Sequence, residues 1–243
     1  MALVDALLTR LEAIAALSDK DRALLASLKI EPKQLKAGEA LQPQGSRPSH
    51  SALLIQGTMA RLQEMTDGAR QIVSFHLPGE IPDLHSLHIE RMDHTLSAVR
   101  PALVGTIAHD ELRRVIAQSG HLGAVLWRET LIDAAVFRQW ITNNGKRGSL
   151  AGMAHLLCEL FLRAQAIGQA KNESWEMPFT QAELGEAIGI TSIHANRILK
   201  QLKTEGAAAI EKSVLHIIAW DKLQAIAGFD ATYLHLKRVP LAA

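Results

Sequence analysis

The 243-residue chain contains one cysteine, Cys158, and no long uncharged apolar run. A single thiol cannot form a disulfide within the chain, and it cannot supply the ligands of a cysteine-bound iron–sulfur cluster. The most apolar stretch, Ala154–Leu162, is interrupted by His155 and Glu159. It falls short of the ~18 apolar residues that a membrane-spanning helix needs, so we expect no contact with a membrane.

Targeting and catalytic motifs are also missing. Asp5 interrupts the apolar run of residues 1–10, and no basic segment precedes that run. We therefore expect no signal peptide and a location in the cytoplasm. The sequence has no pair of catalytic carboxylates, no nucleophile elbow and no phosphate-binding glycine loop, so we expect that the protein is not an enzyme.

The charges nearly balance, since 26 Lys and Arg stand against 25 Asp and Glu. Residues 145–243 hold 11 Lys and Arg against 9 Asp and Glu, which gives that part a net charge of +2 and the remainder −1. Any affinity for nucleic acid must therefore come from locally placed cations rather than from a basic field over the whole molecule.

The spacing of apolar residues divides the chain into segments. Residues 2–30 predict short helices, and Ser18 with Asp21 can cap the second of them. From about residue 33 to residue 107, short apolar runs alternate with turn residues, among them the hairpin candidate Asp67–Gly68. This pattern predicts a β-sandwich or barrel, with strands near 51–56, 59–65 and 71–77.

Residues 122–142 predict one long helix of about six turns, apolar on almost every side. Such a helix must be buried on more than one face, so one face could pack on the barrel and another on the same helix of a second copy. The alternative is an ordinary core helix. In either case, residues 143–146 are expected to end the helix and form a hinge. The residues expected at a dimer interface are Leu122, Val125, Leu126, Ile132, Val136 and Trp140.

The C-terminal part predicts two helices joined by a tight turn, over 180–187 and 192–204. Thr180 and Glu183 fit a capping box, Gly189 suits the left-handed conformation that ends a helix, and Thr191 can cap the second helix. The flanking elements are expected to be a helix over 149–167, a polar loop over 169–179, strands over 208–210 and 214–219, and a short helix over 221–228.

The outer side of the 192–204 helix carries groups that read DNA. At ~100° per residue, Ile193, Arg197 and Lys200 point away from the core. Arg can bind guanine, Asn adenine, and an exposed Ile a thymine methyl group, whereas Lys and the amides at the helix start suit phosphate. The alternative is a two-helix corner with a polar face. The expected DNA contacts are Thr180, Gln181, Thr191, Ser192, Ile193, His194, Asn196, Arg197 and Lys200.

The order of helices, barrel, long helix, helix-turn-helix and hairpin resembles the Crp/Fnr family of transcription regulators. The run 184–197 (LGEAIGITSIHANR) is similar to the DNA-reading part of that family, in the branch with a His-x-Asn-Arg sequence. Arg197 stands at the position of the family's arginine, but Ile193 stands at about the position where some members carry a base-reading glutamate. The operator sequence therefore does not carry over.

The resemblance implies an α+β fold in three parts. These are a sensory β jelly-roll barrel with N-terminal helices over 1–110, a dimerisation helix and hinge over 111–145, and a winged helix-turn-helix over 146–243. The implied function is that of a sequence-specific regulator acting as a homodimer on a near-palindromic site. The implied partners are double-stranded DNA, a second copy of the chain and RNA polymerase.

Family members that bind a cyclic nucleotide hold its phosphate with an Arg that precedes Ser or Thr. Here His94 and Thr95 stand at those positions, so the cation is missing unless Arg91 or Arg100 replaces it. We expect no cyclic nucleotide and no other cofactor, although a cAMP-responsive activator and an effector-free regulator remain alternatives. An unidentified effector would contact Glu80, Asp83, His85, His94 and Thr95.

A set of histidines and acids in the same region could bind a metal or haem. The spacing fits no tight ligand motif, so we expect a polar loop and short helix over the barrel, and no metal. A cupin-type metal enzyme with a vestigial helix-turn-helix is the alternative from another class. The set comprises His76, His85, His88 and His94 with Asp83, Glu90 and Asp93.

Overall fold

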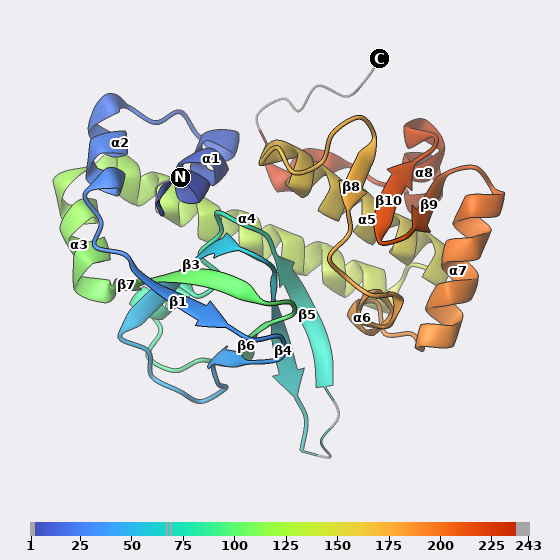
Figure 1. Cartoon of the computed structure of the whole chain (residues 1–243), viewed down its shortest axis with the longest axis horizontal. Coiled ribbons are helices and arrows are strands. Elements are labelled where there is room, and N and C mark those ends of the chain that lie inside the picture. The colour runs from blue at the N-terminus through green and yellow to red at the C-terminus, as the bar shows by residue number, and fades with distance from the viewer. Residues whose placement is uncertain (1–2, 67, 69, 237–243) are drawn as a thin grey trace. The chain divides into compact units, whose positions relative to one another are not determined.

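The computed structural model describes residues 3–66, 68 and 70–236 and divides into two compact units, Met1–Asp133 and Ala134–Ala243 (Figure 1). The boundary between them falls inside one long helix, α4 (Gly120–Gly145). None of the helices in the described ranges has the length and apolarity that a membrane crossing requires. The three-part division expected from the sequence stays a prediction.

Two short helices begin the first unit, as predicted. They are α1 (Asp5–Ile14) and α2 (Asp19–Ala26). The hydroxyl of Ser18 accepts a hydrogen bond from the Asp21 amide at 3.2 Å, and the Asp21 carboxylate accepts one from the Ser18 amide at 3.0 Å. This reciprocal cap confirms the predicted start of α2.

Two antiparallel sheets follow and confirm the predicted barrel of jelly-roll type. One sheet has the order β1-β7-β3 and the other β2-β6-β4-β5. Apolar side chains from both sheets form the core, among them Leu54, Met59 and Leu96. The strands are β1 (Glu31–Leu35), β2 (Ala40–Gln42), β3 (His50–Gln56), β4 (Met59–Glu64), β5 (Arg70–His76), β6 (Thr95–Ala98) and β7 (Ala102–Ala108).

The connections within the barrel domain place its polar groups. Gly68 has a φ of +83° and its amide donates to the Met65 carbonyl at 3.0 Å, in the turn between β4 and β5. Asp67, the other half of the predicted hairpin turn, lies outside the described residues. A 3-10 helix, η1 (Leu84–Leu87), covers β3 before β6, and α3 (His109–Gln118) leads to α4.

The helix break predicted over 143–146 comes later than expected, because α4 continues to Gly145, and the hinge stays a prediction. Both asparagine side chains bond within the second unit. Asn143 Nδ2 lies 3.2 Å from His155 Nδ1, and Asn144 Nδ2 donates to the Ala187 carbonyl at 3.3 Å. These bonds hold the last turn of α4 in place, so the helix does not break at Asn143.

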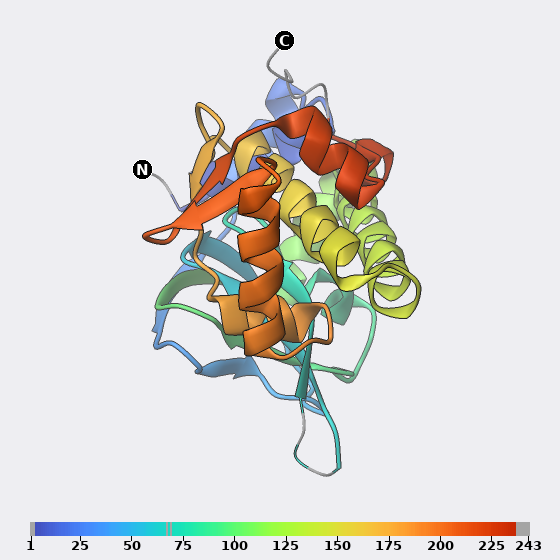
Figure 2. The same cartoon turned by 90° about the vertical axis from the view of Figure 1, so that its right-hand side faces the viewer.

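The second unit has the predicted order of helices and hairpin (Figure 2). Its elements are α5 (Ser149–Ala166), β8 (Ser174–Glu176), α6 (Gln181–Ala187), α7 (Ser192–Thr204), β9 (Ala208–Glu211), β10 (Val214–Ile217), α8 (Trp220–Ala227) and η2 (Ala231–Leu234). Cys158 is buried on α5, as expected for a packing residue.

The prediction of a polar loop over 169–179 is wrong, because this segment contains the strand β8. This strand pairs with β10, so the sheet has the order β8-β10-β9. Trp175, Met177 and Phe179 are buried, and their period of two is that of a strand with one buried face. The run was too short and too rich in charged neighbours to stand out in the sequence.

Candidate functional site

The helix-turn-helix of α6 and α7 begins with the predicted capping box. Thr180 Oγ1 accepts from the Glu183 amide at 3.2 Å, and Glu183 Oε2 accepts from the Thr180 amide at 2.7 Å. Thr191 Oγ1 in turn accepts from the His194 amide at 3.3 Å and caps α7. Both helix starts are therefore set by side chains that the sequence identified.

Two glycines allow the tight turn between these helices. Gly189 has a φ of +70°, a left-handed conformation that glycine adopts without steric cost. Gly185 lies where α7 approaches α6. A Cβ there would stand 2.9 Å from the Ile190 carbonyl oxygen and 3.2 Å from the Ala195 Cβ. A larger residue at position 185 would push the second helix away.

One face of α7 is buried and the opposite face is open. Ala195, Ile198, Leu199 and Leu202 are buried, and α7 packs against α5, α6 and β9 (Figure 2). This division confirms the predicted buried face and fixes the rotation of the helix about its axis. The outward side chains are thereby held on a rigid element.

The open face carries the apolar and basic groups predicted for DNA reading. Ile193 is 83% exposed, and Arg197, Lys200 and Ser192 are exposed as well. Within the described ranges neither Arg197 nor Lys200 forms an ion pair. Exposure of an isoleucine side chain to water is unfavourable. A DNA groove offers thymine methyl groups to the isoleucine, and guanine acceptors and phosphates to the two cations.

Two other predicted contacts engage each other. Asn196 Nδ2 on α7 donates to Gln181 Oε1 on α6 at 2.6 Å, and both side chains are half-buried. His194 is also half-buried. The freely accessible part of the predicted contact set is therefore narrower than the sequence indicated, and it centres on Ile193, Arg197 and Lys200.

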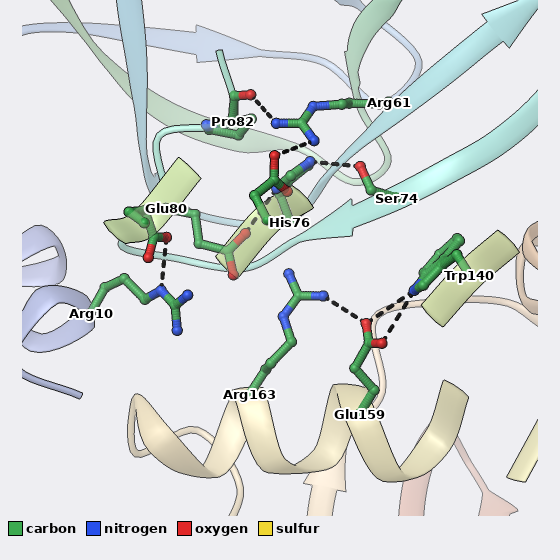
Figure 3. Close-up of polar contacts among 11 residues, drawn as sticks. Arg10, Arg61, Ser74, His76, Glu80, Pro82, Trp140, Glu159 and Arg163 are labelled. Atoms are coloured by element: carbon green, nitrogen blue, oxygen red, sulfur yellow. Dashed lines mark hydrogen bonds and ion pairs between the residues drawn. The ribbon is translucent and has the colours of Figure 1, made fainter. Parts of the chain in front are cut away.

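The structure corrects the prediction of which apolar side chains on α4 are exposed. All six residues expected at a dimer interface, Leu122, Val125, Leu126, Ile132, Val136 and Trp140, are buried within the single chain. Trp140 Nε1, for example, donates to Glu159 Oε1 of α5 at 3.1 Å (Figure 3). The exposed apolar residues of α4 are instead Trp127, Leu131 and Ile141, with exposed fractions of 68%, 56% and 72%. An all-round apolar helix does not tell from its sequence which face the chain itself covers.

Inside the barrel domain, a buried cation that the sequence did not single out lies on β4. Arg61 is only 2% exposed. Its Nη1 lies 2.7 Å from Asp133 Oδ2 on α4, and its Nη2 donates to the Pro82 carbonyl (Figure 3). Arg61 shares its face of β4 with the buried Met59. Ala60 between them is buried too, so no alternation in the sequence pointed to Arg61.

Three of the five residues proposed for an effector pocket form hydrogen bonds to the strands and connections of the barrel. Glu80 accepts from His76 Nδ1 at 2.8 Å (Figure 3), and Thr95 Oγ1 accepts from the Gln44 amide at 3.1 Å. Asp83 Oδ1 accepts from the Ala52 amide at 2.7 Å, and burial raises the pKa of Asp83 to about 7. These groups stabilise the barrel's connections as the structure stands.

The other two, His85 and His94, lie together with Asp93. Their ring centroids are 5.3 Å apart, and His94 Nδ1 lies 2.7 Å from Asp93 Oδ1. Burial, and then the charge of Arg61, lower the pKa of both imidazoles, that of His94 to about 4. The remaining members of the predicted histidine and acid set do not join them. His88 and Glu90, for instance, are exposed.

Comparison with protein families gives two matches along the chain. The model of the Crp-like helix-turn-helix domain matches residues 153–226, which include α6, α7 and the β9–β10 hairpin. The model of the cyclic nucleotide-binding domain matches residues 32–119, which include nearly all of the two sheets of the first unit.

Curated relatives extend over most of the chain. The transcriptional activator protein FnrL of Cereibacter sphaeroides is 25% identical over 204 residues, which cover 82% of this chain and 81% of that protein. The transcriptional activator protein anr of Pseudomonas aeruginosa is 25% identical over 197 residues, which cover 81% and 80%. Among solved structures, FixK2 from Bradyrhizobium japonicum has the same fold, with a TM-score of 0.74 at 18% identity over 82% of this chain and 98% of that one.

Proposed function

The chain belongs to the Crp/Fnr family of DNA-binding transcription regulators, and from that premise we propose that it binds a near-palindromic DNA site as a homodimer. Each copy inserts α7 into the major groove, and the two reading helices lie about 34 Å apart, one turn of DNA. The single observation that carries this proposal is the open strip of Ile193, Arg197 and Lys200 on the exposed face of a helix whose opposite face is buried.

The residues of the reading helix have distinct roles in this proposal. Arg197 binds the two acceptors of a guanine and Ile193 contacts a thymine methyl group. Lys200 and the groups at the helix starts, Thr180, Gln181, Thr191 and Ser192, bind phosphates and set the register. Asn196, braced by Gln181 at 2.6 Å, presents its amide next to Arg197, and His194 lies beside it at the edge of the strip.

The exposed side of α4 supports the homodimer. Its residues follow one another at alternating intervals of three and four, the heptad spacing of a two-stranded coiled-coil seam. Trp127, Leu131 and Ile141 contribute the exposed apolar area, which a second copy of the same helix would cover. The seam comprises Ala124, Trp127, Leu131, Ala134, Arg138 and Ile141.

A cyclic nucleotide does not fit the barrel in this proposal. At the family's phosphate-binding position stands His94, and burial keeps its pKa at about 4, so the imidazole is neutral near pH 7. The buried Arg61 is already paired with Asp133, and a phosphate would have to break that pair. RNA polymerase is the expected further partner, because the curated relatives are transcriptional activators.

Footprinting on the DNA upstream of the protein's own operon tests the proposal. We expect protection of two half-sites whose centres lie about one helical turn apart, and loss of that protection in Arg197→Ala. Lys222→Ala, an exposed cation on α8, serves as the control and should leave protection unchanged. Equal protection by the Arg197 variant and the wild type would remove α7 from the reading role.

A further inference from the structure

A compact group of potential metal ligands lies between η1 and β6 in the barrel domain. His85, Asp93 and His94 can each supply one ligand atom, and these three atoms all lie within 4.8 Å of one another. His85 comes from η1, while Asp93 and His94 immediately precede β6. The three side chains are therefore brought together by two elements that are fixed to the barrel.

Two ring nitrogens in this group are buried and lack a hydrogen-bond partner. Among the described residues, the Nε2 atoms of His85 and His94 have neither solvent contact nor a polar neighbour within bonding distance. A buried polar atom without a partner is destabilising, and an ion bound at His85 Nε2 would give that atom a partner.

We propose that His85, His94 and Asp93 form a binding site for a first-row divalent transition-metal ion. Two imidazole nitrogens and a carboxylate oxygen suit Zn²⁺, Fe²⁺ or Ni²⁺ rather than Mg²⁺ or Ca²⁺, which prefer oxygen ligands. Asp93 Oδ1 and His94 Nδ1 lie 2.7 Å apart, so one ion could bind both atoms in place of the hydrogen bond between them, together with His85 Nε2. The Asp93 side chain is 85% exposed, and it gives the ion a route from solvent.

The state of the two imidazoles agrees with this role. A metal ligand must be a neutral imidazole, and burial together with the charge of Arg61 keeps the pKa of both rings below the usual value. The positive charge of Arg61 opposes a bound cation, whereas the carboxylates of Asp93 and Asp133 favour it. The ligand atoms lie within 4.8 Å of one another, and they must draw closer for each to form a bond of about 2.0–2.2 Å to the ion.

The position of Arg61 links this site to the regulator. Arg61 forms an ion pair with Asp133 on α4 at 2.7 Å. A doubly charged ion near Arg61 would repel its guanidinium and change the geometry of this ion pair. Metal binding would thereby alter the attachment of α4, the helix proposed to form the dimer. This part of the inference rests on the proposed function, whereas the metal site itself does not.

Zinc binding by the full-length chain tests the site. Competition against a chromophoric chelator should give one Zn²⁺ per chain, and Co²⁺ substitution should give the absorption bands of a protein-bound ion. His85→Ala and Asp93→Asn should each weaken zinc binding at least ten-fold, with a circular dichroism spectrum like that of the wild type. His88→Ala is the matched control, because His88 is exposed in the same segment, and it should bind zinc normally.

The same measurements can overturn the proposal. If the His85 and Asp93 variants bind zinc as tightly as the wild type, or if His88→Ala loses as much affinity as they do, the site is not where we place it. The regulatory part is tested separately by DNA affinity of the wild type with and without Zn²⁺, using Arg61→Lys to weaken the link. Equal DNA affinity in a protein shown to hold zinc removes the regulatory part. Arg197→Ala, which should bind zinc like the wild type but bind DNA more weakly, separates the two proposals.

Discussion

Asn196 on α7 donates a hydrogen bond to Gln181 on α6, across 2.6 Å between Nδ2 and Oε1. The bond joins the first residue of one helix to the middle of the next, at the edge of the open strip. It leaves the Asn196 carbonyl oxygen available to a base edge while the amide nitrogen is held. The reading surface is therefore partly ordered before DNA arrives, which lowers the entropy lost on binding.

Removing this brace should weaken DNA binding without unfolding the domain. In Gln181→Ala the Asn196 side chain would have to be immobilised by the DNA itself, at about 0.5–1.5 kcal/mol. The phosphate contact proposed for Gln181 would be lost as well, so Kd should rise at least a few-fold. Fluorescence anisotropy with a footprinted site measures the change. Gln201→Ala, which removes a side-chain bond only to Glu205 at the C-terminal end of α7, should have little effect. Equal losses in the two variants would argue against the brace.

Arg197 and Lys200 should differ in how they contribute to affinity. Arg197→Ala should cost about 1–3 kcal/mol on the correct site and relax the preference for one base pair. Lys200→Ala should weaken binding evenly across sequences and reduce the salt dependence by about one counterion. Binding isotherms at several salt concentrations, on specific and scrambled sites, separate these behaviours. A uniform loss in the Arg197 variant would make it a phosphate contact.

The seam on α4 predicts the oligomeric state. Leu131→Lys would place a charge within the proposed apolar dimer contact, so sedimentation equilibrium should show a dimer for the wild type and a monomer for the variant. DNA affinity should fall with it, because a monomer engages only one half-site. Arg128→Ala changes an exposed residue of the same helix outside the seam, and it should remain dimeric. A dimeric Leu131 variant would place the interface elsewhere.

His155 predicts how the second unit responds to acid. Burial, and then the charge of Arg147, lower its pKa to about 3, while an unfolded histidine has a pKa of about 6.5. Between these values the unfolded state binds more protons, so the free energy of unfolding falls as the pH falls below about 6.5. From pH 7 to pH 5 this single group accounts for about 2 kcal/mol.

Denaturant unfolding at several pH values checks this prediction. Tryptophan fluorescence is a suitable signal, since Trp175 and Trp140 are buried in the second unit. His155→Gln should be less stable at pH 7, because the ring packs against Phe229 and Tyr233. Its stability should nevertheless depend less on pH than that of the wild type. Parallel pH profiles for the two proteins would contradict the assignment.

Local signals in the sequence predicted the helix-turn-helix accurately. The signals are the caps at Thr180 and Thr191 and the left-handed Gly189. Each acts within a few residues, so it can be recognised without knowledge of the fold. The buried face of α7 follows from helical spacing alone. Whether a side chain on the opposite face is free depends on its neighbours, and the bond between Gln181 and Asn196 joins residues that no local rule relates.

Long-range partners account for what the sequence did not predict. Arg61 becomes a buried cation because Asp133, far along the chain, stands beside it. Leu122 and Trp140 turn toward their own chain because other elements of the chain cover those sides of α4. The strand β8 forms because β10 offers a free edge. Pairings of this kind are properties of the folded chain rather than of any window of it.

Cys158 is fully buried on α5, and burial raises the pKa of its thiol. The only native sulfhydryl is therefore shielded from maleimides and similar reagents while the protein stays folded. A cysteine introduced at an exposed position, such as Lys222→Cys on α8, would be the one group that takes a fluorophore or spin label. Probe-to-probe distances between two copies could then be followed during operator binding, on a chain that keeps every other native residue.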